Sequence, residues 1–407
     1  MMRILHISSY SRGGAARAAF RIHKALCKNS VDSHFLSIND NLNKLHTPIS
    51  EKGFIAQKIQ WRLSHHFAIE LDTRRHIEKG LAALPPLDCE IATIPVSAYS
   101  LDEYIRSYKP DIVHLHWVAC NFDYIKFFKD CTTPVVWTLH DMNPFSGLFH
   151  YENDGKRNVT VSGKLDHYVQ KIKKKSIQGF RKNLSVVTPS SWLAKKANES
   201  QVFRNRSIEV IPYPIDLNLF SPADKSELRK KYGFREVEKV LIALADHTQN
   251  FRKGFDLLKE TICKIPGVLL LLIGGKNDDT ESDNNIRYLG RIENDKILSE
   301  YYSLADATII PSREDNLPNV MLESLSCGTP VISFRVGGLA EHVINFETGL
   351  IAEEINAASL HKAIQKFFDN KEKFDSKKIR KYAEGHFNEK LIARKYMEVY
   401  GESLAKP

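Results

Sequence analysis

Two carboxylates, Asp315 and Glu323, stand eight positions apart in the stretch of the chain that carries the most chemical information. The apolar run 307–311 before them predicts a buried strand, residues 320–326 predict a short helix, and the apolar run 331–334 predicts the next strand. This pattern places Asp315 in a turn and Glu323 on a helix, at the carboxyl edge of a parallel sheet, where α/β proteins bind their ligands. An ionised carboxylate at that edge can accept two or more hydrogen bonds from a vicinal diol.

Positive side chains form a second candidate group. Arg252 and Lys253 lie at the end of a loop that follows an apolar strand beginning at Lys239, and they precede Gly254 and a helix predicted over residues 255–264. Two cations just before the start of a helix suit an anionic ligand group.

A glycine pair lies near the start of the chain, between a strand predicted over residues 3–7 and a helix predicted over residues 15–28. Gly13 and Gly14 allow the backbone to approach a ligand, and the N–H groups at the helix start favour an anion. A dinucleotide-binding Gly-x-Gly-x-x-Gly motif is absent from this loop, which argues against an NAD enzyme.

Histidines end two further predicted strands, over residues 111–117 and 134–141. Because an imidazole at the carboxyl end of a strand reaches the ligand-binding edge, His140 is a candidate functional residue. His116 is equally well explained by packing in the core.

The segment from Asp315 to Glu323, with Cys327, Gly328, Thr329 and Pro330 after it, closely resembles the signature of the retaining nucleotide-sugar glycosyltransferases of family four, which have the GT-B fold. The resemblance implies that Asp315 contacts hydroxyls of the donor sugar and that Glu323 holds the ribose hydroxyls of the nucleotide. Asp315 stands where the family usually has Glu.

The resemblance extends to other positions. It implies that His140 contacts the sugar and stabilises the transition state, and that Lys253 binds the diphosphate. The usual Gly-Arg at the head of the second loop is replaced by Ala245 and Asp246, so Arg252 is a candidate substitute for the missing cation. The donor-binding residues expected on this basis are Gly13, Gly14, Arg252, Lys253, Gly274, Arg291, Asp315, Asn316, Leu317, Val320 and Glu323.

The expected activity is transfer of a sugar, with retention, from a UDP- or GDP-linked donor to a growing and lipid-linked bacterial polysaccharide, such as lipopolysaccharide or capsule. His140, Lys253 and Asp315 are the expected catalytic residues. No metal and no other cofactor is expected. The chain lacks the Asp-x-Asp motif with which glycosyltransferases of the other main fold hold Mn or Mg, and its cations and backbone amides would stabilise the charge on the leaving diphosphate instead.

The expected fold is α/β, with two Rossmann-like parallel-sheet domains facing a central cleft. The first is predicted over residues 1–215 and the second over residues 216–387, with a helix at 388–403 returning to the first. The helical period of residues 57–76 predicts a helix that packs on the sheet, or else one that lies at a membrane or binds the acceptor.

The 407 residues carry a net charge of +9, and no motif of a nucleic-acid-binding domain accompanies it. The strongly basic segment 164–182 is a candidate contact with the inner membrane or a lipid-diphosphate acceptor, and a solvated helix face explains it equally well. Six scattered cysteines without metal spacing fit a reduced cytoplasmic compartment. The start of the chain lacks a signal-peptide core, so we expect a cytoplasmic protein, active at the inner face of that membrane.

Two other functions fit parts of the pattern. Asp315 and the missing Gly-Arg suggest a catalytically silent nucleotide-sugar-binding or scaffold subunit of a polysaccharide assembly complex. The second alternative is a sugar epimerase or a phosphorylase on the same fold. The phosphorylase would need a lysine that binds pyridoxal, and no such lysine can be assigned.

Overall fold

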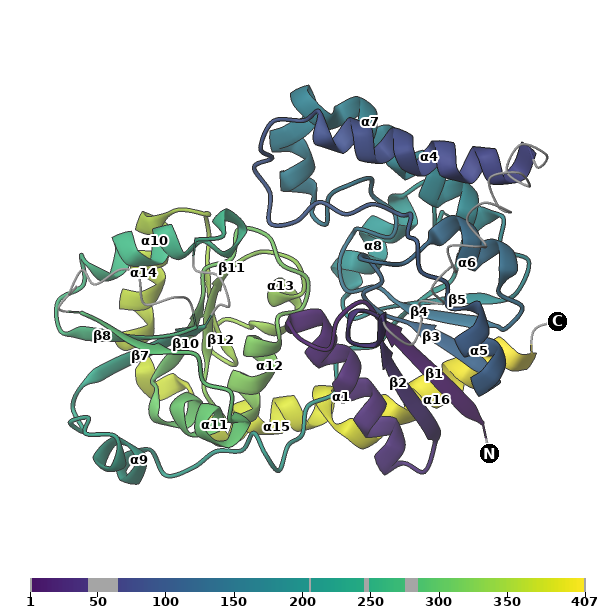
Figure 1. Cartoon of the computed structure of the whole chain (residues 1–407). Coiled ribbons are helices and arrows are strands. Elements are labelled where there is room, and N and C mark those ends of the chain that lie inside the picture. The colour runs from purple at the N-terminus through teal and green to yellow at the C-terminus, as the bar shows by residue number, and fades with distance from the viewer. Residues whose placement is uncertain (1, 43–64, 205, 245–248, 275–284, 406–407) are drawn as a thin grey trace. The chain divides into compact units, whose positions relative to one another are not determined.

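The computed structural model describes residues 2–42, 65–204, 206–244, 249–274 and 285–405. The chain divides into two units (Figure 1). The first contains residues 1–187, 195–209 and 398–407, and the second contains residues 188–194 and 210–397. Each unit is built on one six-stranded sheet with helices against it.

The sheet of the first unit has the strand order β2-β1-β3-β4-β5-β6. Its strands are β1 (Arg3–Ser8), β2 (Asp32–Ser37), β3 (Ile112–Leu115), β4 (Val135–Thr138), β5 (Leu184–Thr188) and β6 (Ile208–Val210). Its helices are α1 (Gly14–Lys28), η1 (Asn39–Asn41), α4 (His65–Ala82), α5 (Asp102–Tyr108), α6 (Tyr124–Asp130) and α7 (Glu152–Gln178), together with the part of α8 (Ser191–Glu199) from residue 195 on. Because β2 and β3 flank β1 on opposite sides, the strand order reverses between β1 and β3, and open α/β sheets bind ligands at such a switch point.

The sheet of the second unit has the order β12-β11-β10-β7-β8-β9. Its strands are β7 (Lys239–Leu244), β8 (Val268–Ile273), β9 (Ile286–Gly290), β10 (Ala307–Ile310), β11 (Val331–Phe334) and β12 (Gly349–Ala352). Its helices are α9 (Lys225–Lys231), η2 (Phe251–Lys253), α10 (Phe255–Ile262), α11 (Asp295–Leu304), α12 (Asn319–Ser326), α13 (Leu339–His342), α14 (Ala357–Phe368), η3 (Lys371–Lys373), α15 (Ser376–Phe387) and α16 (Glu389–Ala405). The switch point of this sheet lies between β7 and β10.

Most strand residues are apolar on both faces because helices cover both sides of a parallel sheet. In the second unit one buried cluster joins β7, β8, β10 and β11 to α10 and α14, with Phe255, Leu258 and Phe367 among its members. Within each of the two sheets the neighbouring strands pair in parallel, which confirms the predicted fold class.

The helix predicted over residues 57–76 begins at His65 in the structure, and residues 57–64 lie outside the described part of the chain. The side chains of residues 57–72 lie outside the described part, so packing of that stretch on the sheet stays a prediction. The described end of the helix contacts another helix. Ile77 of α4 packs in a cluster with Val169 of α7 and with Leu148 and Phe149, which follow β4. Figure 1 shows α4 and α7 side by side.

The last turns of α16, from residue 398 on, belong to the first unit. The hydroxyl of Tyr400 lies 2.7 Å from His114 Nδ1, and Asn183 Nδ2 donates to the carbonyl of Ser403 over 2.7 Å. These contacts attach the end of the chain to β3 and to the residue before β5.

Candidate functional site

Two loops meet at the switch point of the second sheet. Because β7 and β10 are neighbours and run parallel, the loops after them leave the same edge. The backbone N–H of Arg313 donates to the carbonyl of Arg252 over 2.8 Å, which joins the loop after β10 to η2. Residues 245–248, with the replaced Gly-Arg position, lie outside the described residues.

Asp315 is buried at this point and is bound on both oxygens. Its Oδ2 lies 2.7 Å from Lys253 Nζ and accepts a hydrogen bond of 3.2 Å from Ser312 Oγ. Its Oδ1 accepts from the N–H of Asn316 over 3.0 Å. Burial alone would raise the pKa of Asp315, but the cations of Lys253 and Arg252 outweigh it and hold that pKa below its usual value.

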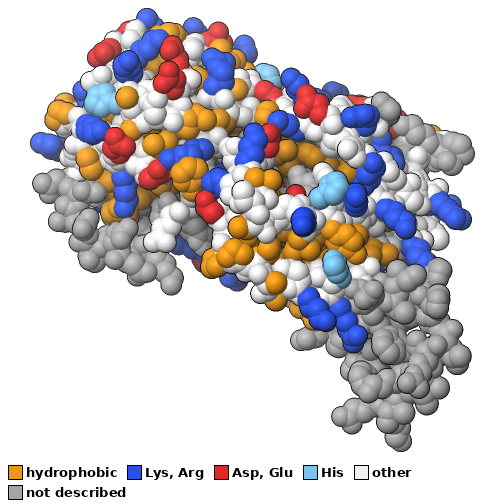
Figure 2. Space-filling view, turned by 90° about the horizontal axis from the view of Figure 1, so that it is seen from above, with side chains coloured by type: hydrophobic (Ala, Val, Ile, Leu, Met, Phe, Trp, Pro, Cys, Tyr) orange, Lys and Arg blue, Asp and Glu red, His pale blue; other side chains and the backbone are white. Residues whose placement is uncertain are grey.

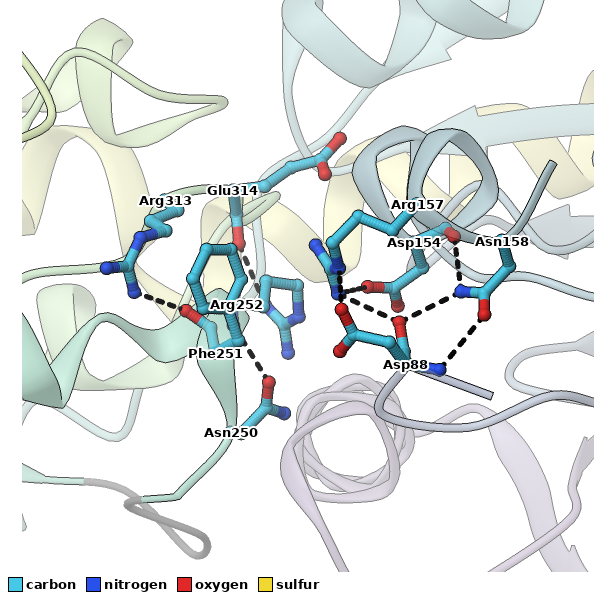
Figure 3. Close-up of polar contacts among 9 residues, drawn as sticks. All are labelled: Asp88, Asp154, Arg157, Asn158, Asn250, Phe251, Arg252, Arg313 and Glu314. Carbon is cyan, nitrogen blue, oxygen red and sulfur yellow. Dashed lines mark hydrogen bonds and ion pairs between the residues drawn. The ribbon is translucent and has the colours of Figure 1, made fainter. Parts of the chain in front are cut away.

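The two neighbouring cations differ in their access to solvent. The side chain of Arg252 is 6% exposed, lies 3.5 Å from Asp315 and donates to the carbonyl of Glu314 over 2.9 Å (Figure 3). The side chain of Lys253 is 27% exposed. Arg252 therefore holds the loop after β10 in place, and Lys253 is the better placed of the two to meet a ligand.

Two glycines let the loops approach each other. Gly254 has φ +68°, and a Cβ there would lie 1.9 Å from the carbonyl oxygen of Pro311. Gly337 has φ +48°, and a Cβ there would lie 1.7 Å from the carbonyl oxygen of Asp315. Only glycine fits either position, because both the backbone conformation and the available space exclude a side chain.

Asn316 is held by residues for which sequence reasoning assigned no role. Ser190 Oγ donates to Asn316 Oδ1 over 2.6 Å, and the N–H of Gly338 donates to the Asn316 carbonyl over 2.6 Å. Nearby, the carboxylate of Glu341 accepts from the N–H groups of Ser191 and Trp192, at 3.0 and 2.8 Å. The Pro189-Ser190 pair directly after β5 and the glycine pair Gly337-Gly338 after β11 are the sequence signals that could have pointed to these residues.

The other predicted donor-binding residues of this unit come from α12 and its preceding loop and from the ends of β8 and β9. Glu323 is buried on α12, where it accepts a hydrogen bond of 2.8 Å from the hydroxyl of Tyr302. Leu317 is buried in the loop, and Val320 lies in the first turn of α12. Gly274 follows β8 with φ +93°, and its N–H donates to the carbonyl of Gly290 at the end of β9; the exposed Arg291 comes next in the chain.

In the first unit, Gly13 precedes α1 with φ +91°, and a Cβ there would meet nothing within 4 Å. Gly14 is the first residue of the helix, which has no acidic residue in its first turn. The start of α1 therefore lies near the switch point between β1 and β3, and its role toward an anion stays a prediction.

Asp141, next to His140, is also buried and fully bound. Its Oδ2 accepts from His150 Nδ1 over 2.6 Å and from Trp117 Nε1 over 2.7 Å, and its Oδ1 accepts from the N–H of Asn143 over 2.9 Å. Burial alone would raise the pKa of Asp141, but His150 and these donors outweigh it and keep that pKa below its usual value. Asp141 thus fixes the loop that carries His140.

The basic segment 164–182 belongs mainly to α7. The prediction that its lysines form a basic surface is wrong for one of them. Lys173 is buried at 1% exposure and donates to the carbonyls of Asn143 and Gly147 at 2.8 and 2.7 Å. Burial lowers its pKa to about 7. Lys173 therefore holds the loop after β4 and is no part of a basic surface.

The exposed residues of α7 include Lys164, His167, Lys171 and Lys175, which we call the α7 stripe. Their spacing of three or four residues places them on one helix face. In Figure 2, seen from the side on which α4 and α7 lie, lysine and arginine side chains are set among hydrophobic ones. At the other end of α7, Arg157 and Asn158 bind Asp88 (Figure 3).

Two family models match the chain. "Glycosyl transferases group 1" matches residues 224–386, and "Glycosyltransferase Family 4" matches residues 12–219, which is half of the chain. The chain belongs to glycosyltransferase family 4. The family predicted from the Asp315–Glu323 stretch is thereby confirmed.

Curated proteins match parts of the chain. A D-inositol 3-phosphate glycosyltransferase of Mycobacteroides abscessus is 27% identical over 212 residues, 49% of this chain and 47% of that protein. An N-acetyl-alpha-D-glucosaminyl L-malate synthase of Bacillus anthracis is 28% identical over 182 residues, 41% of this chain and 46% of that protein. The chain thus spans about half the length of these relatives.

Several solved structures resemble the whole chain. A sucrose-phosphate synthase of Thermosynechococcus elongatus aligns over 100% of both chains with a TM-score of 0.70 and 18% identity. WaaG, a glycosyltransferase involved in lipopolysaccharide biosynthesis, aligns over 98% of this chain and 99% of its own, with a TM-score of 0.62 and 14% identity. These likenesses show the fold, and the predicted GT-B fold is confirmed.

Within the described residues, the helices are all too short or too polar to span a membrane.

Proposed function

We propose that this protein transfers a sugar from a nucleotide-diphosphate donor to a hydroxyl acceptor, with Lys253 at the donor diphosphate and Asp315 at the donor sugar. The observation that carries the proposal is the pairing of these two residues at the switch point between β7 and β10. Lys253 reaches solvent while Asp315 anchors its ammonium group. A preorganised cation of this kind stabilises charge on a leaving diphosphate without reorganising.

Other residues complete the proposed donor site. Glu323 is assigned to the ribose hydroxyls, and Gly274 and Arg291 to the nucleotide. The amides of the Asn316 turn and of the Gly13-Gly14 loop are assigned to the phosphates. His140 is assigned to the donor sugar from the family resemblance alone. Retention and independence of a divalent metal are proposed on the same basis.

The donor is proposed to be UDP- or GDP-linked. One solved relative, HepE of Anabaena, is described in complexes with UDP and with UDP-glucose, and a second, a starch synthase of Arabidopsis thaliana, in a complex with ADP. These descriptions justify a screen of UDP, GDP and ADP, together with their glucose conjugates.

The acceptor is proposed to be a lipid-linked glycan of a bacterial surface polysaccharide, met at the cytoplasmic face of the inner membrane. The α7 stripe supports this proposal, because exposed cations at helical spacing suit an anionic lipid surface. WaaG, with its role in lipopolysaccharide biosynthesis, shares the fold.

The test combines ligand binding with turnover. The nucleotide that fits should raise the melting temperature, because ligand at a hundred times its Kd adds about 2.7 kcal/mol to the stability. Donor hydrolysis and transfer to lipid-linked glycans are then measured with and without a chelator. Lys253→Ala should lower turnover about 100- to 1000-fold.

Lys264→Ala is the matched control, since Lys264 is 60% exposed and pairs only locally with Glu260. Wild-type turnover in Lys253→Ala, or loss of activity on chelation, would contradict the assignment. A silent nucleotide-sugar-binding subunit would give the thermal shift with no turnover of any donor.

A further inference from the structure

Four histidines of the first unit lie together around the switch point between β1 and β3. Strand pairing puts His6 of β1 beside His114 of β3. His116 lies two residues beyond His114 and therefore on the same face of the sheet. On β4, Thr138 and His140 are likewise two residues apart, and the His114 ring lies 2.8 Å from Thr138 Oγ1. The rings of all four histidines are buried.

Three of these rings form a continuous string of hydrogen bonds. His6 Nδ1 lies 2.8 Å from His116 Nε2, and His116 Nδ1 lies 3.2 Å from His140 Nε2. Both nitrogens of His116 are therefore used within the string, which joins β1 to the loop that begins at His140.

His114 stands beside this string and outside it. Its Nδ1 bonds with the Tyr400 hydroxyl and its Nε2 with Thr138 Oγ1. It is therefore a natural control for changes made in the string.

Burial favours the neutral form of every ring in the string. Burial lowers the pKa of His140 to about 4 and holds the pKa values of His6 and His116 well below the usual value. A neutral imidazole has one donor and one acceptor nitrogen. The two hydrogen bonds must therefore point in the same direction along the string.

The ring of His6, at the end of the string away from His140, indicates the direction in which the hydrogen bonds are donated. His6 Nε2 is buried and has no hydrogen-bond partner among the described residues. An orphaned N–H inside a protein is rarer than an orphaned acceptor, so the proton of His6 belongs on Nδ1. His6 then donates to His116, and His116 donates to His140.

We propose that His6 and His116 are positioning residues that fix the tautomer of His140, leaving its Nε2 as an acceptor and its proton on Nδ1. Together with the proposed function, on which this role rests, it makes His140 a hydrogen-bond donor to a sugar oxygen of the donor substrate. It also makes His140 unsuited to remove a proton through Nδ1.

The same rings could in principle hold a metal ion, since ligand atoms of His6, His114 and His116 lie within 4.8 Å of one another. The hydrogen bonds of these rings argue against a bound metal ion. Both nitrogens of His114 already meet hydroxyl groups, and both nitrogens of His116 meet other rings. A metal would have to break contacts that already satisfy these atoms.

The tautomer can be read directly from two-bond ¹⁵N–¹H correlations of the histidine rings in the full chain, with single-residue variants for assignment. In the wild type we expect His140 to carry its proton on Nδ1. His116→Leu and His116→Gln remove the donor next to His140 and should shift the proton wholly or partly to Nε2. His116→Asn places an amide where Nδ1 stands, and should keep the wild-type tautomer.

Turnover of the nucleotide-sugar should follow the tautomer. His116→Leu should lower kcat about 10- to 100-fold with little change in KM, as for other residues that orient a functional histidine. His116→Asn should keep most of the wild-type kcat. His114→Leu is the matched control, because it removes an equally buried ring from the same strand and should leave the tautomer of His140 unchanged.

Three results would overturn the proposal: a wild-type His140 with its proton on Nε2, a tautomer unchanged in both His116→Leu and His116→Gln, or one equivalent of bound Zn²⁺ that is lost in His6 or His116 variants. If no variant and no wild-type sample turns over a nucleotide-sugar, the proposed function fails, and the ring correlations still decide the tautomer. If turnover is normal and the correlations disagree, only the proposal about the string fails.

Discussion

At the scale of single residues, side chains of the same charge have different roles because their surroundings differ. Arg252 and Lys253 are adjacent in the chain and both lie within 3.5 Å of Asp315, yet Arg252 is buried against the loop and Lys253 reaches solvent. Asp315 is needed between them, because two neighbouring cations without a counter-charge would repel each other.

The first prediction concerns Asp315→Asn. We expect it to lower the free energy of unfolding by about 2–3 kcal/mol at pH 7, somewhat less than for a fully buried pair because Lys253 keeps access to water. The folded-state pKa of Asp315 is lowered, so its contribution is present above about pH 4 and is lost as the pH falls through the folded-state value. Urea unfolding of wild type and variant between pH 7 and pH 3 measures the difference.

Glu293→Gln is the control for this experiment, because Glu293 lies 3.6 Å from Arg291 in an exposed pair. It should change stability by less than about 0.5 kcal/mol. A difference between wild type and Asp315→Asn that stays constant down to pH 3 would contradict the proposed ion pair.

At the scale of elements, the candidate site depends on how closely loops can approach. The loops after β7, β10 and β11 pack backbone against backbone at Gly254 and Gly337. The same principle appears in the first unit, where α7 holds the loop after β4 through Lys173.

The second prediction is that Gly337→Ala destabilises the second unit more than Gly233→Ala. Both residues have positive φ, and the conformation alone costs about 1–2 kcal/mol for alanine. A Cβ at Gly233 meets nothing within 4 Å, whereas one at Gly337 strikes the Asp315 carbonyl. Thermal unfolding should show the larger loss for Gly337→Ala, together with weaker nucleotide binding; equal losses would mean that the loops can separate at little cost.

The third prediction uses the buried amine of α7. Lys173 has a folded-state pKa of about 7 against 10.5 for an ordinary lysine, so the unfolded chain binds one more proton between these values. Stability from this residue therefore rises with pH over that window, by at most about 1.4 kcal/mol per pH unit. In Lys173→Met this rise should disappear, as measured by urea unfolding from pH 7 to pH 10.

Lys171→Met is the matched control, because Lys171 is exposed two residues away on the same helix. Its stability should keep the pH dependence of the wild type. If Lys173→Met and the wild type run parallel across the window, the amine is not neutral in the folded protein.

At the scale of the whole molecule, the chain has 58 basic and 49 acidic residues. This excess of positive charge can bind an anionic surface only where exposed cations lie on one face. The α7 stripe is such a place. The fourth prediction is that Lys164→Gln, Lys171→Gln and Lys175→Gln together weaken binding to vesicles with anionic lipid about 100-fold, at about 1 kcal/mol for each lysine.

A triple change of equal charge on α15, with Lys377, Lys378 and Lys381 replaced by Gln, is the control, since all three are exposed. Co-sedimentation with vesicles at low and physiological salt measures both variants. An equal loss in both would mean that net charge alone governs the binding.

Most elements were predictable because buried parallel strands leave continuous apolar runs, and because glycine, proline and helical periodicity mark their ends. The strands β1, β10 and β11 and the helices α1 and α12 lie within a residue or two of the predicted ranges. The packing of α4 on α7 was missed, since a helical period shows which face is apolar and not what covers it.

The sequence by itself determined the family and the fold class, and it supplied the residues proposed to bind a nucleotide-sugar, because all of these depend on motifs read along the chain. Only the tertiary structure decided that Lys173 is buried, that Arg252 holds a loop and that His6, His116 and His140 share hydrogen bonds. The physical reason is that protonation, hydrogen bonding and exposure depend on neighbours brought from distant parts of the chain, and strand order sets which neighbours those are.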